Sequence, residues 1–86
     1  MWYVYILKSA KIAKWIYVGS TNQLARRLRE HFEGKCVSTK PYLPVRVNAY
    51  IAVSSEAKAK SLEKYLKTGS GKAILKKRIL SDEALA

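Results

Sequence analysis

Five side chains in this sequence are of the types that phosphodiester hydrolysis requires. Tyr5 and Tyr17 carry phenols on strand-forming segments, Arg27 and His31 lie one turn apart in a basic helix-forming segment, and Glu63 stands among lysines. Hydrolysis of a phosphodiester needs an activated water, a cation beside the developing charge and usually a divalent metal held by a carboxylate. The chain has one histidine and only six acidic residues, so few side chains can fill these roles.

Each of these candidates also has an ordinary structural interpretation. Tyrosines in strands commonly fill a core, and arginines on helices are commonly solvated. On a helical wheel His31 falls in the apolar stripe of Leu24 and Leu28, with Arg27 at its edge. This position suits either a hydrogen-bonded core histidine or a general base that also contacts phosphate. Residue type alone leaves both interpretations open.

Glu63 is the candidate metal ligand. It shares the apolar stripe of its helix with Ala59, where an acid is unusual. A carboxylate that pairs with substrate phosphate suits Mg²⁺ or Mn²⁺, and no second carboxylate has a spacing that suggests a two-metal site. We therefore expect one ion. The alternative is an acid at the edge of a helix, paired with nearby lysines: Lys60, Lys64 or Lys67.

The charge balance indicates a polyanionic partner. The 86 residues include 17 Lys and Arg against 6 Asp and Glu, a formal net charge of +11. Nucleic acid is the favoured partner, with a membrane surface or an acidic protein as alternatives. The residues expected to contact nucleic acid are Gly19, Arg26, Arg29, Lys35, Thr39, Lys40 and Arg46. Individual lysines also fit a charged, solvated surface.

The cysteine count and the length of the apolar runs indicate the cellular compartment. Cys36 is the only cysteine, which excludes an intrachain disulfide and a zinc site built from several thiolates. The apolar run at 2–7 is too short for a membrane span or a signal-peptide core. We expect a protein of the reducing cytoplasm with no membrane association.

The pattern of apolar and breaker residues predicts one α+β domain over 1–80 and a C-terminal tail over 81–86. Three segments are predicted strands: 2–7, 15–19 and 45–53. Three are predicted helices: about 22–33, a segment that begins at Ser54 or Ser55 and ends at Gly69-Ser70-Gly71, and 72–80. In the third strand Val45, Val47, Ala49, Ile51 and Val53 alternate with other residues, which predicts a single apolar face. The stretches 8–14 and 34–44 are predicted connections.

In this order, the segments resemble a GIY-YIG nuclease domain. Tyr3-Val4-Tyr5 matches the first signature segment, and Tyr17-Val18-Gly19 matches the second. The first-helix pattern is matched by Thr21, Leu24, Arg27, Leu28 and His31, and the metal-binding glutamate by Glu63. The resemblance covers residues 2 to about 79 and is greatest to the small stand-alone members, which are similar to the incision domain of excision repair. We therefore expect no additional DNA-binding domain.

The resemblance implies a three-stranded antiparallel sheet flanked by helices and hydrolysis of DNA with one divalent cation. It implies that Tyr17 helps to activate water beside Tyr5, that Arg27 stabilises the phosphorane-like charge and that His31 supports proton transfer or contacts phosphate. Glu63 would bind the metal. The sequence departs from the family pattern at Tyr3, where the signature begins with glycine, at Ser20, where some repair members have lysine, and after Glu63, where no asparagine follows.

These observations predict a metal-dependent DNA endonuclease that selects branched, nicked or single-stranded substrates by structure rather than by sequence. The alternative hypotheses are a basic nucleic-acid-binding domain of the same fold without turnover, and a module that docks an acidic protein. A protein partner that supplies specificity would fit, and so would a monomer or a weak homodimer. The catalytic hypothesis assumes that the phenols, Arg27 and Glu63 line a single cationic pocket.

Overall fold

The sheet at the centre of the molecule has three antiparallel strands. The computed structural model describes residues 1–79. Strands β1 (Trp2–Ser9), β2 (Ile16–Thr21) and β3 (Val45–Val53) lie in the order β2-β1-β3, so that β1 is central and β2 is an edge strand. Both neighbours of β1 run antiparallel to it. The prediction of a three-stranded antiparallel sheet is confirmed.

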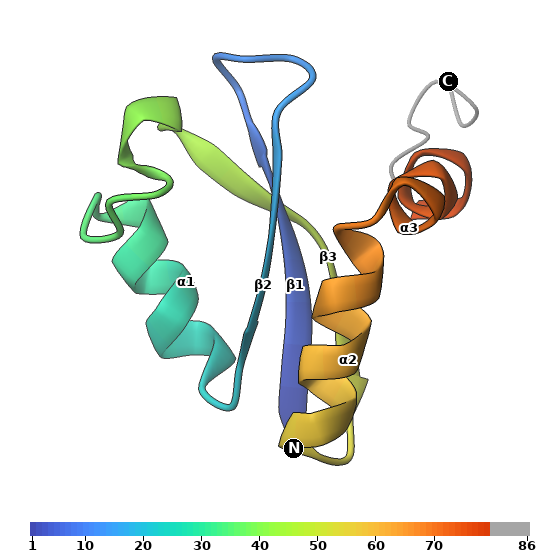
Figure 1. Ribbon diagram of the computed structural model, residues 1–86. Coiled ribbons are helices and arrows are strands. Elements are labelled where there is room, and N and C mark those ends of the chain that lie inside the picture. Colours follow the sequence, from blue (N-terminus) through green and yellow to red (C-terminus); the bar gives the residue numbers. More distant parts are fainter. Residues whose placement is uncertain (80–86) are drawn as a thin grey trace.

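Helices cover both faces of this sheet (Figure 1). Helix α1 (Leu24–Phe32) packs on one face, and helices α2 (Glu56–Leu66) and α3 (Gly69–Ile74) lie on the other, followed by a π-helical turn over Leu75–Ile79. Helix α2 begins where the Ser55 hydroxyl accepts a hydrogen bond from the Lys58 backbone N–H at 3.2 Å. The arrangement confirms the predicted α+β fold class.

Strand β1 is buried on both faces because it lies between two helical layers. Val4 and Ile6 belong to the apolar cluster on the α2 face, and Tyr5 and Leu7 to the cluster on the α1 face. All four are at most 1% exposed. A strand buried in this way is expected to be apolar on both faces, as the sequence of 2–7 is.

Strand β3 contains an irregularity that the sequence pattern did not reveal. In the register with β1, Ile6 pairs with Ala49 but Leu7 pairs with Val47, so β3 has one extra residue at this point. An extra residue moves the following side chains to the other face. Val45 and Val47 accordingly pack on the α1 face, whereas Ala49 and Val53 pack on the α2 face. The prediction of a single apolar face is therefore wrong.

Two predicted boundaries also change. Gly69-Ser70-Gly71 does not end a helix but forms the first turn of α3, because the Thr68 hydroxyl accepts a hydrogen bond from the Gly71 N–H at 3.1 Å. Gly71 packs so closely on the preceding helix that a Cβ there would lie 2.6 Å from the Leu66 Cα. The connection at 34–44 contains a 3₁₀ helix at Lys40–Tyr42.

The remaining expectations concern the ends of the chain and the membrane. The tail predicted at 81–86, and the last residue of the predicted helix at 72–80, lie outside the described residues. Among residues 1–79, no helix has both the length and the apolar character that crossing a membrane requires.

Candidate active site

A buried chain of hydrogen bonds links β1 to α1 and to the connection that follows it. The Tyr5 hydroxyl lies 2.9 Å from His31 Nε2, and His31 Nδ1 lies 2.8 Å from the Thr39 hydroxyl. The Thr39 hydroxyl also donates to the Cys36 carbonyl at 3.5 Å, so it accepts from an Nδ1–H. We assign the proton to Nδ1 on this network, which leaves Nε2 to accept the Tyr5 proton.

The surroundings hold these groups in their neutral forms. Burial raises the pKa of Tyr5 to about 12, although the neighbouring Arg27 opposes this rise. Burial, together with the positive charge of Arg27, lowers the pKa of His31. His31 is 0% exposed, so a substrate does not touch it directly. At neutral pH the pair is a protonated phenol that donates to a neutral imidazole.

Arg27 brings the positive charge to this cluster. Burial works against its charge, but polar interactions with Tyr5 and Glu30 raise its pKa. Its guanidinium forms an ion pair with Glu30 at 3.1 Å, and the side chain is 36% exposed. Arg27 is therefore held by Glu30 and still accessible to an anion.

Tyr17 completes the group on the α1 face. Its ring centroid lies 6.2 Å from that of Tyr5 and 5.2 Å from that of His31. Tyr17 is half-buried, whereas Tyr5 is not exposed. The structure thus brings together Tyr5, Tyr17, Arg27 and His31, the four side chains for which a catalytic role was predicted.

Two residues expected to contact nucleic acid have internal roles. Thr39 is 0% exposed, and its hydroxyl is engaged by His31 and the Cys36 carbonyl. Gly19 lies opposite Tyr5 in the sheet, and a Cβ there would meet the Tyr5 hydroxyl at 2.5 Å. Burial leaves no room for a phosphate against the Thr39 side chain, and the missing side chain of Gly19 makes space for the Tyr5 ring. We therefore assign Thr39 to holding the His31 ring and Gly19 to leaving space for the Tyr5 ring.

Glu63 lies on the other face of the sheet. Its Oε1 accepts a hydrogen bond from the Ser20 hydroxyl at 2.6 Å, and its Oε2 lies 2.8 Å from Lys67 Nζ. Burial opposes its ionisation, but the bonds from Lys67 and Ser20 hold the pKa of Glu63 below its ordinary value. Within residues 1–79, its hydrogen bonds and ion pairs go to Ser20, Lys60 and Lys67, and none to the cluster on the α1 face.

Strand β2 joins the two groups. Alternation along the strand directs Tyr17 and Gly19 to the α1 face, and Val18 and Ser20 to the α2 face. Figure 1 shows β2 running between the two helices. Instead of the single pocket expected, the candidate residues form two groups on either side of this edge strand.

A pocket of about 350 Å³ lies along the same strand. Its lining includes Tyr17 from the one group and Lys67, the ion-pair partner of Glu63, from the other; Lys72 adds a further positive charge. The pocket therefore adjoins residues from both groups.

Glu63 is the carboxylate in this part of the molecule that could bind a divalent cation. Within residues 1–79 no group of three or more His, Cys, Asp and Glu side chains gathers to hold a metal. Mg²⁺ commonly uses one or two carboxylates and completes its shell with water and substrate phosphate. Glu63 is ionised, partly exposed and beside the Ser20 hydroxyl, so it can be the single protein carboxylate of such a site.

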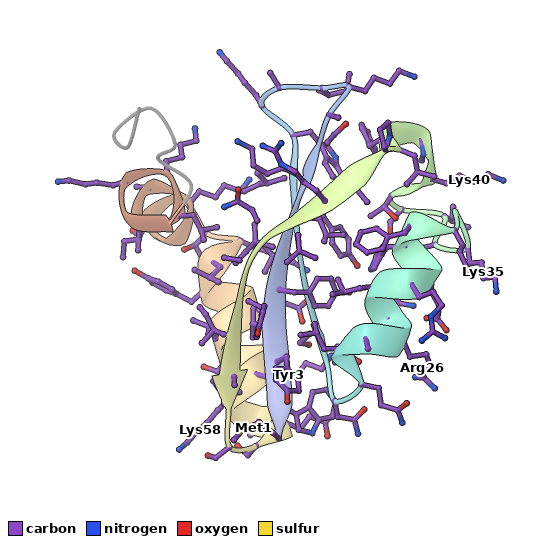
Figure 2. The ribbon with its side chains drawn as sticks, turned by 180° about the vertical axis from the view of Figure 1, so that it is seen from behind. Met1, Tyr3, Arg26, Lys35, Lys40 and Lys58 are labelled. Carbon is purple, nitrogen blue, oxygen red and sulfur yellow. The ribbon has the colours of Figure 1, made fainter. Side chains whose placement is uncertain are left out.

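The other predicted contact residues lie on α1 and on the segment after it, except for Arg46, which is on β3. Arg26, Lys35 and Lys40 project away from the sheet on this side of the molecule (Figure 2). Lys35 forms an ion pair with Glu33 at 3.1 Å. Arg29 is exposed on α1. These positions give the α1 side a positive charge around the Tyr5 cluster.

Residues 1–78 match the family model described as the GIY-YIG catalytic domain. The chain belongs to the GIY-YIG family. No curated protein and no solved structure matches it significantly. Members of the GIY-YIG family are endonucleases that generally use a divalent metal, so the fold is that of a nuclease domain and its expected substrate is nucleic acid. The resemblance inferred from the two tyrosine signatures is thereby confirmed.

Sequence reasoning missed the part of Ser20 in this GIY-YIG site and named Lys67 only as one of three possible ion-pair partners of Glu63. Ser20 had been noted only as a departure from the family pattern, yet its hydroxyl holds Glu63 at 2.6 Å. Lys67 forms the shortest ion pair of Glu63. The separation of four residues between Glu63 and Lys67 was a usable signal, because such pairs lie on one helical face. Nothing local could have linked Ser20 to a residue 43 positions later.

The histidine of this GIY-YIG domain should titrate below its ordinary pKa. Because His31 is the only histidine, its ring signals in an NMR pH titration are unambiguous. At a pH between the pKa of folded His31 and the ordinary value of 6.5, unfolding takes up a proton. The contribution of His31 to the free energy of unfolding is therefore complete above pH 6.5 and is lost as the pH falls towards the folded pKa. The pKa of Glu63 is lowered from its ordinary value of 4.5, so protonation of this carboxylate affects stability only at a lower pH than protonation of His31. A measured pKa of His31 at or above 6.5 would contradict the proposed neutral imidazole.

Proposed function

We propose that this protein is an endonuclease that hydrolyses DNA phosphodiester bonds with one divalent metal ion, Mg²⁺ or Mn²⁺. The observation that carries the proposal is the pocket on the β2 edge, which adjoins Tyr17 on one side and the Lys67–Glu63 pair on the other. A phosphate in this pocket would lie beside Tyr17 and the positive charges of Lys67 and Lys72, and Glu63 is the ion-pair partner of Lys67. These are the groups that phosphoryl transfer needs.

The roles of the α1-face residues follow from their exposure. Tyr17 and Arg27 are accessible, so they contact the substrate: Tyr17 orients the attacking water, and Arg27 neutralises charge on the phosphoryl oxygens. Tyr5 and His31 are buried behind them. The neutral imidazole of His31 accepts the Tyr5 proton, which fixes the phenol oxygen towards Arg27. His31 therefore acts by positioning rather than by touching phosphate.

Glu63 would hold the metal, with Ser20 and Lys67 fixing the direction of its carboxylate. The cation would supply Lewis-acid stabilisation of the charge that develops on the phosphate. The Ser20 hydroxyl lies on the same strand as Tyr17 and Gly19, so β2 sets the spacing between the two halves of the site.

We propose that selectivity comes from the shape of the DNA. The predicted contact residues on the α1 side are mostly arginine and lysine, which bind phosphates and carry no base information by themselves. Branched, nicked or single-stranded DNA is the proposed substrate, with sequence preference, if any, supplied by a protein partner.

The proposal is tested by incubating the protein with labelled single-stranded, duplex, nicked and branched DNA, and with matched RNA, in Mg²⁺, in Mn²⁺ and in EDTA. Cleavage that needs the metal and is faster on one of the non-duplex forms is the expected result. Tight binding without cleavage in either metal would instead support the alternative, a nucleic-acid-binding domain of the same fold.

A further inference from the structure

A second pocket lies beyond the Tyr5 cluster on the α1 face of the sheet. It has a volume of about 590 Å³ and lies between the first turns of α1 and the strands β1 and β3. Its lining includes two tyrosines, Tyr3 and Tyr50, and two arginines, Arg26 and Arg29. None of these four belongs to the catalytic or metal-binding groups described above. Tyr3 and Arg26 lie towards the same end of the molecule (Figure 2).

The two tyrosines offer an accessible aromatic surface. Their ring centroids are 6.2 Å apart at an interplanar angle of 66°, an edge-to-face pair. Tyr50 is 58% exposed although it lies in a strand directly opposite the buried Tyr5. An exposed tyrosine braced by a second ring offers aromatic surface at low conformational cost, which suits stacking with a flat partner.

The charges around this surface suit an anion. Within residues 1–79 neither Arg26 nor Arg29 has an ion-pair partner, whereas Arg27 between them is paired with Glu30. The first turn of α1 contains no acidic residue. A flat aromatic surface beside two available guanidinium groups matches a nucleotide, whose base stacks and whose phosphate pairs with arginine.

We propose that this pocket binds one unpaired nucleotide of the DNA strand that is cleaved. This inference rests on the proposed function and specifies the substrate of that site. Tyr3 and Tyr5 are two residues apart on one face of β1, a separation of about 6.6 Å. The pocket therefore lies about one nucleotide of extended strand from the Tyr5 cluster. A paired base is held in its stack and does not reach the tyrosines, so the pocket favours single-stranded or frayed ends.

The test measures binding in EDTA, where no cleavage occurs, so that the pocket is judged separately from nuclease activity. Fluorescence anisotropy gives the affinities for a short single-stranded oligonucleotide and for a blunt duplex of the same sequence. Tyr50→Ala should weaken binding to the single strand about tenfold, as expected for loss of one stacked base, and leave duplex binding unchanged. Tyr50→Phe should retain the affinity because the ring remains.

Tyr65→Ala is the matched control, because Tyr65 is also an exposed tyrosine, 42% accessible, but lies on α2 across the sheet. An equal loss in Tyr65→Ala, or equal losses on single strand and duplex in Tyr50→Ala, would overturn the proposal. A second measurement needs no variant: an abasic site moved along the oligonucleotide should weaken binding at one position, and Tyr50→Ala should remove that sensitivity. Uniform sensitivity along the oligonucleotide would also overturn it.

Discussion

Replacement of Glu63 by glutamine is expected to reduce metal-dependent cleavage about 10³-fold, because a bound metal supplies several kcal/mol of charge stabilisation and each ~1.4 kcal/mol changes the rate tenfold. Glutamine keeps the size of the side chain and an oxygen that can accept from Ser20, but it removes the charge that a cation needs. The measurement is the single-turnover cleavage rate as a function of Mn²⁺ concentration, at saturating protein.

Stability and positioning can be separated from metal binding by two further measurements. The ion pairs of Glu63 involve exposed lysines, whose contribution is at most about 1 kcal/mol, so the Tm of Glu63→Gln should fall by less than about 8 °C. Ser20→Ala removes a hydrogen bond and keeps the carboxylate, so the cleavage rate should fall far less and higher Mn²⁺ should restore part of it. Wild-type cleavage by Glu63→Gln would exclude Glu63 as the metal ligand.

The Arg27→Ala variant is expected to lose cleavage by about 10² to 10³-fold, the usual effect of removing one group that stabilises charge in the transition state. DNA binding should change much less, because many other lysines and arginines also contribute to phosphate attraction. Arg27→Lys should recover only part of the rate, since lysine keeps the charge but cannot make two directed bonds. The readout is the single-turnover rate compared with the affinity measured in EDTA.

Glu30→Gln is the control for this prediction. It breaks the 3.1 Å ion pair of Arg27 and leaves the guanidinium beside Tyr5. A loss of cleavage in Glu30→Gln as large as that in Arg27→Ala would show that the ion pair, and not contact with phosphate, accounts for the effect. Parallel losses of binding and cleavage in Arg27→Ala would also contradict a role in the transition state.

Much of the fold was predictable because local patterns agree with it. The two-sided apolar sequence of 2–7 indicated a central strand, and the helical wheel placed His31 in the buried stripe, where it is 0% exposed. The extra residue between Val47 and Ala49 was not predictable, because either register gives a plausible run of apolar and polar residues. The start of α3 at Gly69 depends on the Thr68 cap and on packing against Leu66, which glycine-rich sequence alone does not reveal.

The site was predictable in part, for a similar reason. Tyr5, Tyr17, Arg27 and His31 come from adjacent elements, so their meeting on one face follows from a hairpin and the next helix. The position of Glu63 depends on which face α2 covers, and that is decided by long-range packing of Ala59 and Leu66 on Val4 and Ile6. The sequence pattern could identify Glu63 as an unusual acid, but it could not show that strand β2 lies between Glu63 and the two tyrosines.

In the proposed function, Glu63, Tyr17 and Arg27 act on the same phosphate across β2. The most direct measurement is a crystal structure of the Tyr17→Phe protein with Mn²⁺ and single-stranded DNA, with the ion located by its anomalous scattering. We expect Mn²⁺ bound to Glu63 and to one oxygen of a phosphate whose other oxygen contacts Arg27. Mn²⁺ on Glu63 with every phosphate beyond the reach of Arg27, or a phosphate on Arg27 with Mn²⁺ elsewhere, would contradict it.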